Sequence, residues 1–248
     1  MASRLSRLPW TSEHPCTSVS GDAAARERRL MAAATSTVAA QLQDWASEQI
    51  SAITVATGGS RTLVQWEHYP TDDVCEPNCG LRYYYHCHES PRATGEHGHF
   101  HVFVDYAVPT RSDEARYSHL VGISVDAYGL PISLFTVNRW VTGGCWLPAR
   151  ELLQRAEQLL SAVAPSASKH SYRELTAFIV GLTKLFAPEI CALLAARDTK
   201  TAGWNEANFE DRRREILTKC PISMVERLST SINCRSLRRD NRTSRRRA

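Results

Sequence analysis

Apolar residues recur at helical spacing near both ends of the chain, whereas its middle has the pattern of strands. From Asp22 onward, apolar residues recur at a spacing close to that of a helix. The positions are Leu30, Ala34, Val38, Leu42, Trp45 and Ile50, and Gly58-Gly59-Ser60 ends the run. This period predicts an amphipathic helix over residues 22–57, with Asp22 as its N-cap. Residues 1–21 lack such a period, and we expect them to be irregular or disordered.

Residues 61–139 are rich in Val, Ile, Tyr, Phe and Thr, the residue types that favour strands. We predict about five strands with short connections, at 62–68, 82–89, 97–106, 119–127 and 131–138, and a loop over 72–80. Short connections between successive strands favour an antiparallel meander sheet.

Helical spacing returns after Asn138. Pro148 suits the first turn of a helix that runs to about Val163, and a longer helical stretch begins at Ser171 and should kink at Pro188. Short helices are expected over 209–219 and 222–228. A run of strands followed by a run of helices predicts an α+β protein. We expect a single domain over 22–233, in which an N-terminal helix at 22–57 and a C-terminal helical bundle at 146–230 flank the sheet at 61–139.

The basic charge of the chain is concentrated in its tail. The net charge is +4, but residues 235–248 contain seven arginines and one aspartate, and the remainder has 23 basic and 25 acidic residues. We therefore expect a basic, disordered tail over 234–248. Only this tail is suited to nucleic acid, and the body of the protein is not.

The sequence shows no signal for targeting or for a membrane. No apolar run approaches the ~18 residues that span a bilayer. The arginines near the N-terminus are not followed by the apolar segment of a secretory signal. We therefore expect a cytoplasmic protein that does not associate with membranes and keeps most of its eight cysteines reduced.

Histidines are concentrated in the predicted sheet. Seven of the nine lie between His68 and His119, and five alternate along two stretches, Tyr83-Tyr-Tyr-His-Cys-His-Glu89 and Glu96-His-Gly-His-Phe-His101. Histidine is the commonest metal ligand in proteins and also titrates near neutral pH. A cluster of this density indicates a site.

The register of the hairpin that these two stretches form decides whether the histidines meet. Opposed residues of an antiparallel pair share a face, and successive residues alternate faces. If His86 faces His99 and Tyr84 faces His101, one face carries all five histidines: His86, His88, His97, His99 and His101. The other face then carries Tyr83, Tyr85, Cys87, Gly98, Phe100 and Val102. Odd shifts would split both sets, and burial of the apolar face disfavours them.

These five histidines are the candidate metal ligands, and we expect three or four to bind directly while the others support them. Paired Cβ atoms in a hairpin lie ~5 Å apart, so the imidazoles can converge on one ion. Open coordination positions would suit a divalent transition metal such as iron, zinc, manganese or copper. Tyr84, Glu96 and Arg139 are the candidate catalytic residues. No residues are assigned to an organic cofactor.

Other assignments stay open at this point. The histidines could form a hydrogen-bonded network with the tyrosines and bind no metal. Cys75 and Cys79 could form a structural zinc site with His86 or His88. A Ser-His-Asp or Cys-His triad is a further option, although no G-x-S-x-G, P-loop or dinucleotide motif is present. The His-x-His spacing is similar in style to cupin barrels, but the second cupin motif is not evident.

Arg139 lies in the run Asn138-Arg-Trp-Val-Thr-Gly-Gly-Cys-Trp146, where a strand ends and the helical region begins. Its guanidinium could bind a carboxylate or phosphate of a substrate in a bidentate manner. Packing of a domain corner by the two tryptophans explains the same run equally well.

The two histidine stretches, together with Gln65-Trp-Glu-His-Tyr-Pro70 and Phe135-Thr-Val-Asn-Arg-Trp-Val-Thr142, resemble a family of bacterial proteins of unknown function. That family has a Tyr-Tyr-Tyr-His-x-His stretch followed by Glu-His-Gly-His-Phe-His, and the resemblance covers residues 25–230. It implies no activity. Relatives often have Glu after the Thr-Gly that corresponds to Thr142-Gly143, whereas this chain has Gly144 and Cys145 there.

The sequence supports three functional hypotheses. The first is a metal-dependent enzyme, an oxidoreductase or a hydrolase, acting on a small-molecule substrate whose anionic group Arg139 orients. The second is a metal-binding or sensing protein without turnover. The third is a metal-free interaction domain with a pH-sensitive histidine surface. The sequence does not determine the oligomeric state.

Overall fold

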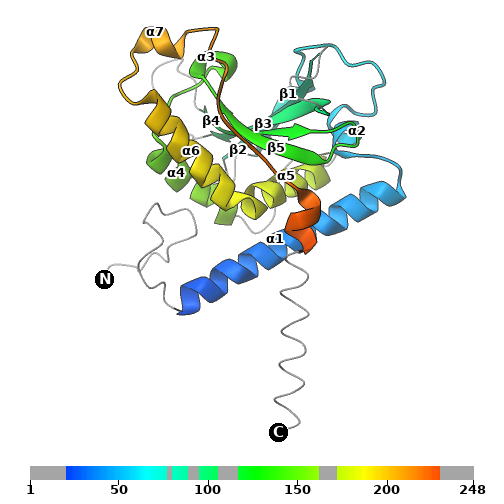
Figure 1. The fold of residues 1–248 in the computed structure, drawn as a ribbon. Coiled ribbons are helices and arrows are strands. Elements are labelled where there is room, and N and C mark those ends of the chain that lie inside the picture. The colour runs from blue at the N-terminus through cyan, green and yellow to red at the C-terminus, as the bar shows by residue number, and fades with distance from the viewer. Residues whose placement is uncertain (1–20, 77–79, 89–94, 106–116, 162–171, 230–248) are drawn as a thin grey trace.

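An antiparallel sheet backed on one side by helices forms the body of the protein in the computed structural model (Figure 1). The structure describes residues 21–76, 80–88, 95–105, 117–161 and 172–229. Six strands pair in sequence order: β1 (Tyr69–Glu76), β2 (Leu81–Cys87), β3 (Gly98–Asp105), β4 (Tyr117–Val125), β5 (Pro131–Val137) and β6 (Ile216–Pro221). The α+β class and the antiparallel meander are confirmed. The predictions for the two ends of the chain fall outside the described residues, except at Gly21.

The labelled helices are α1 (Gly21–Ser47), α2 (Ala52–Ala56), α3 (Arg139–Thr142), α4 (Ala149–Ser161), α5 (Arg173–Leu185), α6 (Ala187–Thr201) and α7 (Glu206–Phe209). Residues 224–229 are also helical, close to the short helix predicted over 222–228. In Figure 1, α1, α4 and α5 lie below the sheet. Pro188 lies in the first turn of α6, where its missing N–H is tolerated, and the axes of α5 and α6 meet at 70°. The predicted kink at Pro188 is confirmed.

Three predicted elements differ from the structure. The helix expected over 22–57 is divided into α1 and α2, with Gln49 at a φ of 57° between them. The first strand was expected at 62–68, but β1 begins at Tyr69 and extends into the predicted loop. Trp66 has a φ of 65°, a left-handed conformation that a strand does not accommodate, so the chain turns before it enters the sheet. At the other end, β6 replaces part of the helix expected over 209–219, because Leu134 to Thr136 of β5 offer an open sheet edge for it to pair with.

One face of the sheet packs on the helices and forms the hydrophobic core. Its side chains include Tyr83, Tyr85, Cys87, Phe100 and Val102, all of which were predicted for the face opposite the histidines. The hydroxyl groups of Tyr83 and of Thr176 on α5 lie 2.9 Å apart, which satisfies both in the buried core. Gly181 of α5 lets α1 approach closely, since a Cβ there would lie 2.7 Å from Val38.

The opposite face carries histidines, and a bulge decides which ones. In the β3–β4 pair, Val102 faces Val121 but Phe103 faces His119, so Leu120 is an extra residue in β4. Without the bulge, Phe103 would face Leu120, and His119 would point to the helical side. The bulge therefore keeps Leu120 in the core and turns His119 to the face of His101.

Within the described part of the chain, no single helix is both long and apolar enough to cross a bilayer. The bent pair formed by α5 and α6 passes the same test of length and composition when its two helices are taken together. In this fold, Leu175, Phe178 and Ile179 of α5 are buried in the core.

Substitution of Gly122 tests how tightly side chains pack on the histidine face of the sheet. A Cβ on Gly122 would overlap the ring of Phe135, which lies 5.0 Å from the His99 ring. We expect Gly122→Ala to lower the free energy of unfolding by about 1–3 kcal/mol, as overpacking of a dense core does. Urea unfolding measures this change. Adding Phe135→Leu should restore part of the loss, and a Gly122→Ala variant with wild-type stability would contradict the packing described.

Candidate metal centre

Three histidines from β2 and β3 converge on one point of the sheet. His86 pairs with His99 in the predicted register, and His88 follows β2 directly. One ring nitrogen from each of the three lies within 4.8 Å of the others. Bonds from histidine to a transition metal are ~2.0–2.1 Å long, so small rotations of the rings bring three nitrogens to one ion. His86 and His99 are buried, whereas His88 is partly exposed.

Glu96 fixes the orientation of His99. Its Oε1 lies 2.8 Å from His99 Nδ1, and its Oε2 lies 3.6 Å from Lys219 Nζ on β6. Burial alone would raise the pKa of Glu96, but the hydrogen bond with His99 and the charges of His99 and Lys219 lower it overall. Because an ionised carboxylate only accepts, His99 Nδ1–H donates to Glu96 in either protonation state of the ring. When His99 is neutral, its Nε2 therefore carries a lone pair. Carboxylates hold metal-binding histidines in this way.

The Nε2 atom of His99 faces that of His86. The two atoms are 2.6 Å apart, so one of them donates a hydrogen bond to the other, and with His99 neutral the donor is His86. Two imidazole nitrogens that share one proton in this way could also share one cation. A metal at this position would replace the proton.

His101 and His119 extend the cluster toward β4. His101 Nδ1 lies 3.0 Å from His119 Nε2, and the His101 ring is 4.8 Å from that of His99. Burial lowers the pKa of His101 well below its usual value, and the neighbouring His99 and His119 lower it further. Both effects oppose a positive charge, so His101 is neutral at pH 7. His119 thus approaches the cluster from β4.

Tyr84 borders the cluster on the β1 side. Its ring stacks on His68 at 3.5 Å between centroids and lies 5.3 Å from that of His101. His68 Nδ1 is 2.9 Å from Asp73 Oδ1, which fixes the far side of the stack. Burial, with the charge of Asp73 in second place, raises the pKa of Tyr84, so its hydroxyl keeps its proton at neutral pH.

His97 does not share the face on which the sequence placed it. Its Nδ1 lies 2.6 Å from the hydroxyl of Tyr85, a residue of the core face, and the side chain is exposed. The reason is that β3 begins only at Gly98, so strict alternation does not apply to His97. Gly98 has no side chain, and the Tyr85 hydroxyl occupies the space that a Cβ would fill. Four of the five predicted histidines therefore share one face: His86, His88, His99 and His101.

Arg139 is not brought to the histidines. Within the described part of the chain, its guanidinium contacts Glu206 Oε2 at 2.5 Å and Glu210 Oε1 at 2.9 Å, and it lies over the Phe209 ring. The two carboxylates on or beside α7 balance its charge. This is the packed corner that the sequence left open as the alternative, and it leaves substrate binding by Arg139 without support from the geometry.

The sequence analysis missed three contributors to this face. Trp66 lies against His88, Lys219 reaches Glu96 from β6, and Ser124 faces His99 across the β3–β4 pair. Trp66 stands two residues before His68 in the sequence, which was a usable signal. Lys219 had none, because its contact depends on a strand that the sequence did not predict.

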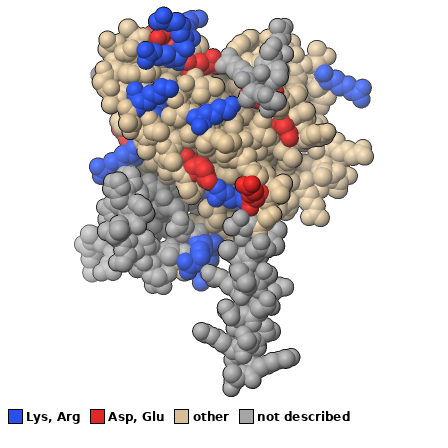
Figure 2. All heavy atoms as spheres, in the orientation of Figure 1, with Lys and Arg blue, Asp and Glu red and all other residues tan. Residues whose placement is uncertain are grey.

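Charges on the surface have no single sign. Figure 2 shows basic and acidic side chains close together, most densely over the region of α7, while most of the visible face is uncharged. In that region Asp211 pairs with both Arg213 and Arg214, and Glu206 pairs with Arg139. On this face, among the described residues, such mixed charge does not form a basic stripe.

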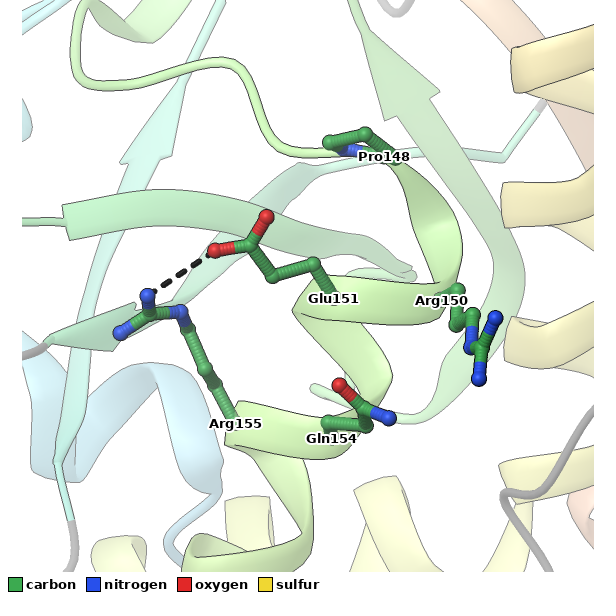
Figure 3. Close-up of a pocket in the computed structure, with 5 residues that line it drawn as sticks. All are labelled: Pro148, Arg150, Glu151, Gln154 and Arg155. Carbon is green, nitrogen blue, oxygen red and sulfur yellow. Dashed lines mark hydrogen bonds and ion pairs between the residues drawn. The ribbon is translucent and has the colours of Figure 1, made fainter.

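A pocket on α4 lies apart from the histidines. It has a volume of about 540 Å³ and is lined by Pro148, Arg150, Glu151, Gln154 and Arg155 (Figure 3). Glu151 Oε1 and the Arg155 guanidinium are 2.9 Å apart, whereas Arg150 points away from this pair in Figure 3. None of the residues that line it belongs to the histidine cluster, and we assign no function to it.

The cysteines do not complete the cluster within the described residues. Cys87 is buried in the core, as predicted. Cys75 is exposed on β1, where it pairs with Arg82, and Cys79 lies outside the described residues. The alternative of a zinc site with both cysteines stays a prediction.

Comparison with known proteins places the chain in a family but gives no activity. A family model described as a domain of unknown function, DUF6969, matches residues 32–222, which is most of the chain, and the protein belongs to this family. The resemblance seen in the sequence, to a family without a known function, is confirmed to that extent. No curated protein and no solved structure matches the chain. The function must therefore be argued from the site.

Removing Glu96 should destabilise the fold. In Glu96→Ala, the buried Nδ1–H of His99 loses its acceptor, and we expect the free energy of unfolding to fall by about 1–3 kcal/mol. Urea unfolding of the metal-free protein measures this. Glu210→Ala is the matched control, since that carboxylate is 60% exposed, and a change within about 0.5 kcal/mol is expected for it. Equal effects in the two variants would contradict the role of Glu96.

Proposed function

We propose that the protein is a metal-dependent enzyme in which His86, His88 and His99 hold a divalent transition metal. The observation that supports this most strongly is the convergence of three ring nitrogens within 4.8 Å, with a buried carboxylate behind one of them. Three protein ligands leave coordination positions open, which is the arrangement of catalytic rather than structural sites. His88 is partly exposed, so the cluster lies close to the surface of the protein.

The chemistry is that of the metal. When bound, such an ion supplies Lewis acidity and, for iron, copper or manganese, redox chemistry, so the enzyme is an oxidoreductase or a hydrolase. Zinc, iron, manganese and copper all accept imidazole ligands, and the histidine set does not choose among them.

The residues around the proposed metal would orient one ligand, compensate charge and provide a hydrogen-bond donor. Glu96 orients His99 and compensates part of the positive charge that a cation introduces. Tyr84 keeps its proton at neutral pH, so its hydroxyl is able to donate a hydrogen bond or a proton at the edge of the cluster. His101 and His119 form a neutral, hydrogen-bonded pair behind the ligands.

The runner-up function is metal binding or sensing without turnover. The burial of His86 and His99 favours it, since a site that only stores or senses a metal needs no access for a substrate. A small-molecule substrate, cytoplasmic location and bacterial origin belong to the same proposal and are tested separately from the metal.

Elemental analysis of the purified protein tests the metal. Wild-type protein purified both aerobically and anaerobically should contain about one transition metal per chain, and His86→Ala/His99→Ala should contain almost none, because two of three ligands are gone. Circular dichroism should show that the double variant keeps its fold. Wild-type protein without stoichiometric metal from either purification would overturn both the enzyme and the metal-binding hypotheses.

His97→Ala is the matched control for this experiment. His97 is exposed and bonded to Tyr85, so its removal should leave the metal content unchanged. Loss of metal from His97→Ala would show that the five-histidine arrangement expected from the sequence is the correct one.

A finer variant tests the role of Glu96. Glu96→Gln keeps the size of the side chain and an oxygen that can accept from His99, but it removes the charge. We expect a 10- to 100-fold weaker affinity for Co²⁺, roughly the effect of changing a residue that supports a metal ligand. Titration followed by the visible absorption of Co²⁺ measures this, with Glu210→Gln as the control. Unchanged affinity for Co²⁺ would mean that the charge of Glu96 does not contribute to metal binding.

A further inference from the structure

Trp66 occupies a backbone position that is poorly suited to tryptophan. A hydrogen bond from Glu67 N to Val64 O closes a turn in which Trp66 is the third residue, with a φ of 65°. Turns with positive φ at this position usually place Gly or Asn there, because a bulky side chain strains the backbone. Residues in strained backbone conformations are often found at functional sites, so the position of the Trp66 side chain is informative.

The turn places the indole directly beside the candidate metal centre. The indole centroid lies 4.3 Å from that of the His88 ring and 5.9 Å from that of His86, with interplanar angles of 74° and 83°. At the same time Trp66 is 58% exposed, and Val64 on the same turn is 50% exposed. Trp66 thus exposes a large apolar side chain to solvent beside two of the three candidate ligands, and Val64 exposes another on the same turn.

The turn is attached to the sheet. Val64 N donates to the hydroxyl of Tyr69 at 2.7 Å, and Tyr69 pairs with Tyr85 in β1 and β2. Trp66 N also reaches Cys87 O, between the ligands His86 and His88, at 3.5 Å. These bonds hold the backbone of the turn against β2, and the indole lies beside His86 and His88.

We propose that Trp66, supported by Val64, selects the substrate: a small molecule with a flat aromatic group attached next to the nitrogen or oxygen atom that binds the metal. The inference rests on the proposed function, because the metal anchors one end of the molecule. An indole standing nearly perpendicular to His86 and His88 presents an apolar surface to whatever enters beside them. The indole of Trp66 would then supply specificity for the substrate, and the metal would supply affinity.

Two ligands that differ only in the aromatic group provide the test. Full-length protein is loaded with Co²⁺ and titrated with imidazole and with 4-phenylimidazole, and the visible absorption of Co²⁺ reports binding of each to the metal. We expect wild-type protein to bind 4-phenylimidazole about five- to tenfold more tightly than imidazole, the ratio that one aromatic contact supplies. Trp66→Ala should abolish this preference and leave the affinity for imidazole unchanged.

Further variants separate recognition from folding. Trp66→Phe should keep most of the preference, because an aromatic ring remains. Trp66→Gly should lose it while unfolding at the same or a higher urea concentration, because Gly accepts a positive φ without strain. Tyr128→Ala is the control, since Tyr128 is an exposed aromatic residue, at 79%, on the β4–β5 turn, and its loss should change neither affinity.

The possible failures are distinguishable. Co²⁺-loaded wild-type protein without any preference, or Trp66→Ala with the full preference, overturns the role of Trp66 and leaves the metal centre standing. Failure of the wild-type protein to bind Co²⁺ overturns the proposed function and this inference with it.

Discussion

The pairing of β2 with β3 is the constraint on which the rest of the structure depends. His86 opposite His99 and Tyr84 opposite His101 follow from one register, and a shift of one residue would move every side chain to the other face. That shift would put histidines into the helix-facing core and expose Tyr83, Tyr85 and Phe100. The apolar core therefore determines the position of the histidines, although it contains none of them. The same burial that stabilises the fold assembles the candidate site.

A cluster of buried imidazoles is costly unless its hydrogen bonds are made. Here Glu96 accepts from His99, His99 and His86 share one hydrogen bond, and His101 pairs with His119. Satisfying these groups offsets the loss of their hydration, and burial keeps His101 and His119 neutral. A cation that bound here would therefore meet rings that are already held in place, and preorganisation of this kind raises affinity in general.

Irregularities in and beside the sheet decide which side chains surround the candidate site. The bulge at Leu120 turns His119 to the histidine face, the start of β3 at Gly98 releases His97 from it, and the turn before β1 sets Trp66 beside the ligands. Each departure changes which side chains surround the site, and none is visible as a hydrophobic period. An enzyme that recognises its substrate through Trp66 would owe its specificity to such a departure and its metal to the regular part of the hairpin.

The sequence by itself determined the α+β class, the sequence of an N-terminal helix, an antiparallel meander and further helices, the kink at Pro188 and the face shared by His86, His88, His99 and His101. These follow from local periods and from alternation within one hairpin, which depend on residues near one another in the chain. Only the tertiary structure decided that residues 216–221 form a sixth strand and that Lys219 reaches Glu96. The ion pairs of Arg139 with Glu206 and Glu210 also depend on the tertiary structure. Those contacts join segments far apart in the sequence, and the local pattern of a segment does not say which partner it will meet. The bulge and the turns were also beyond the sequence, because a single added residue or one positive φ leaves composition and period almost unchanged.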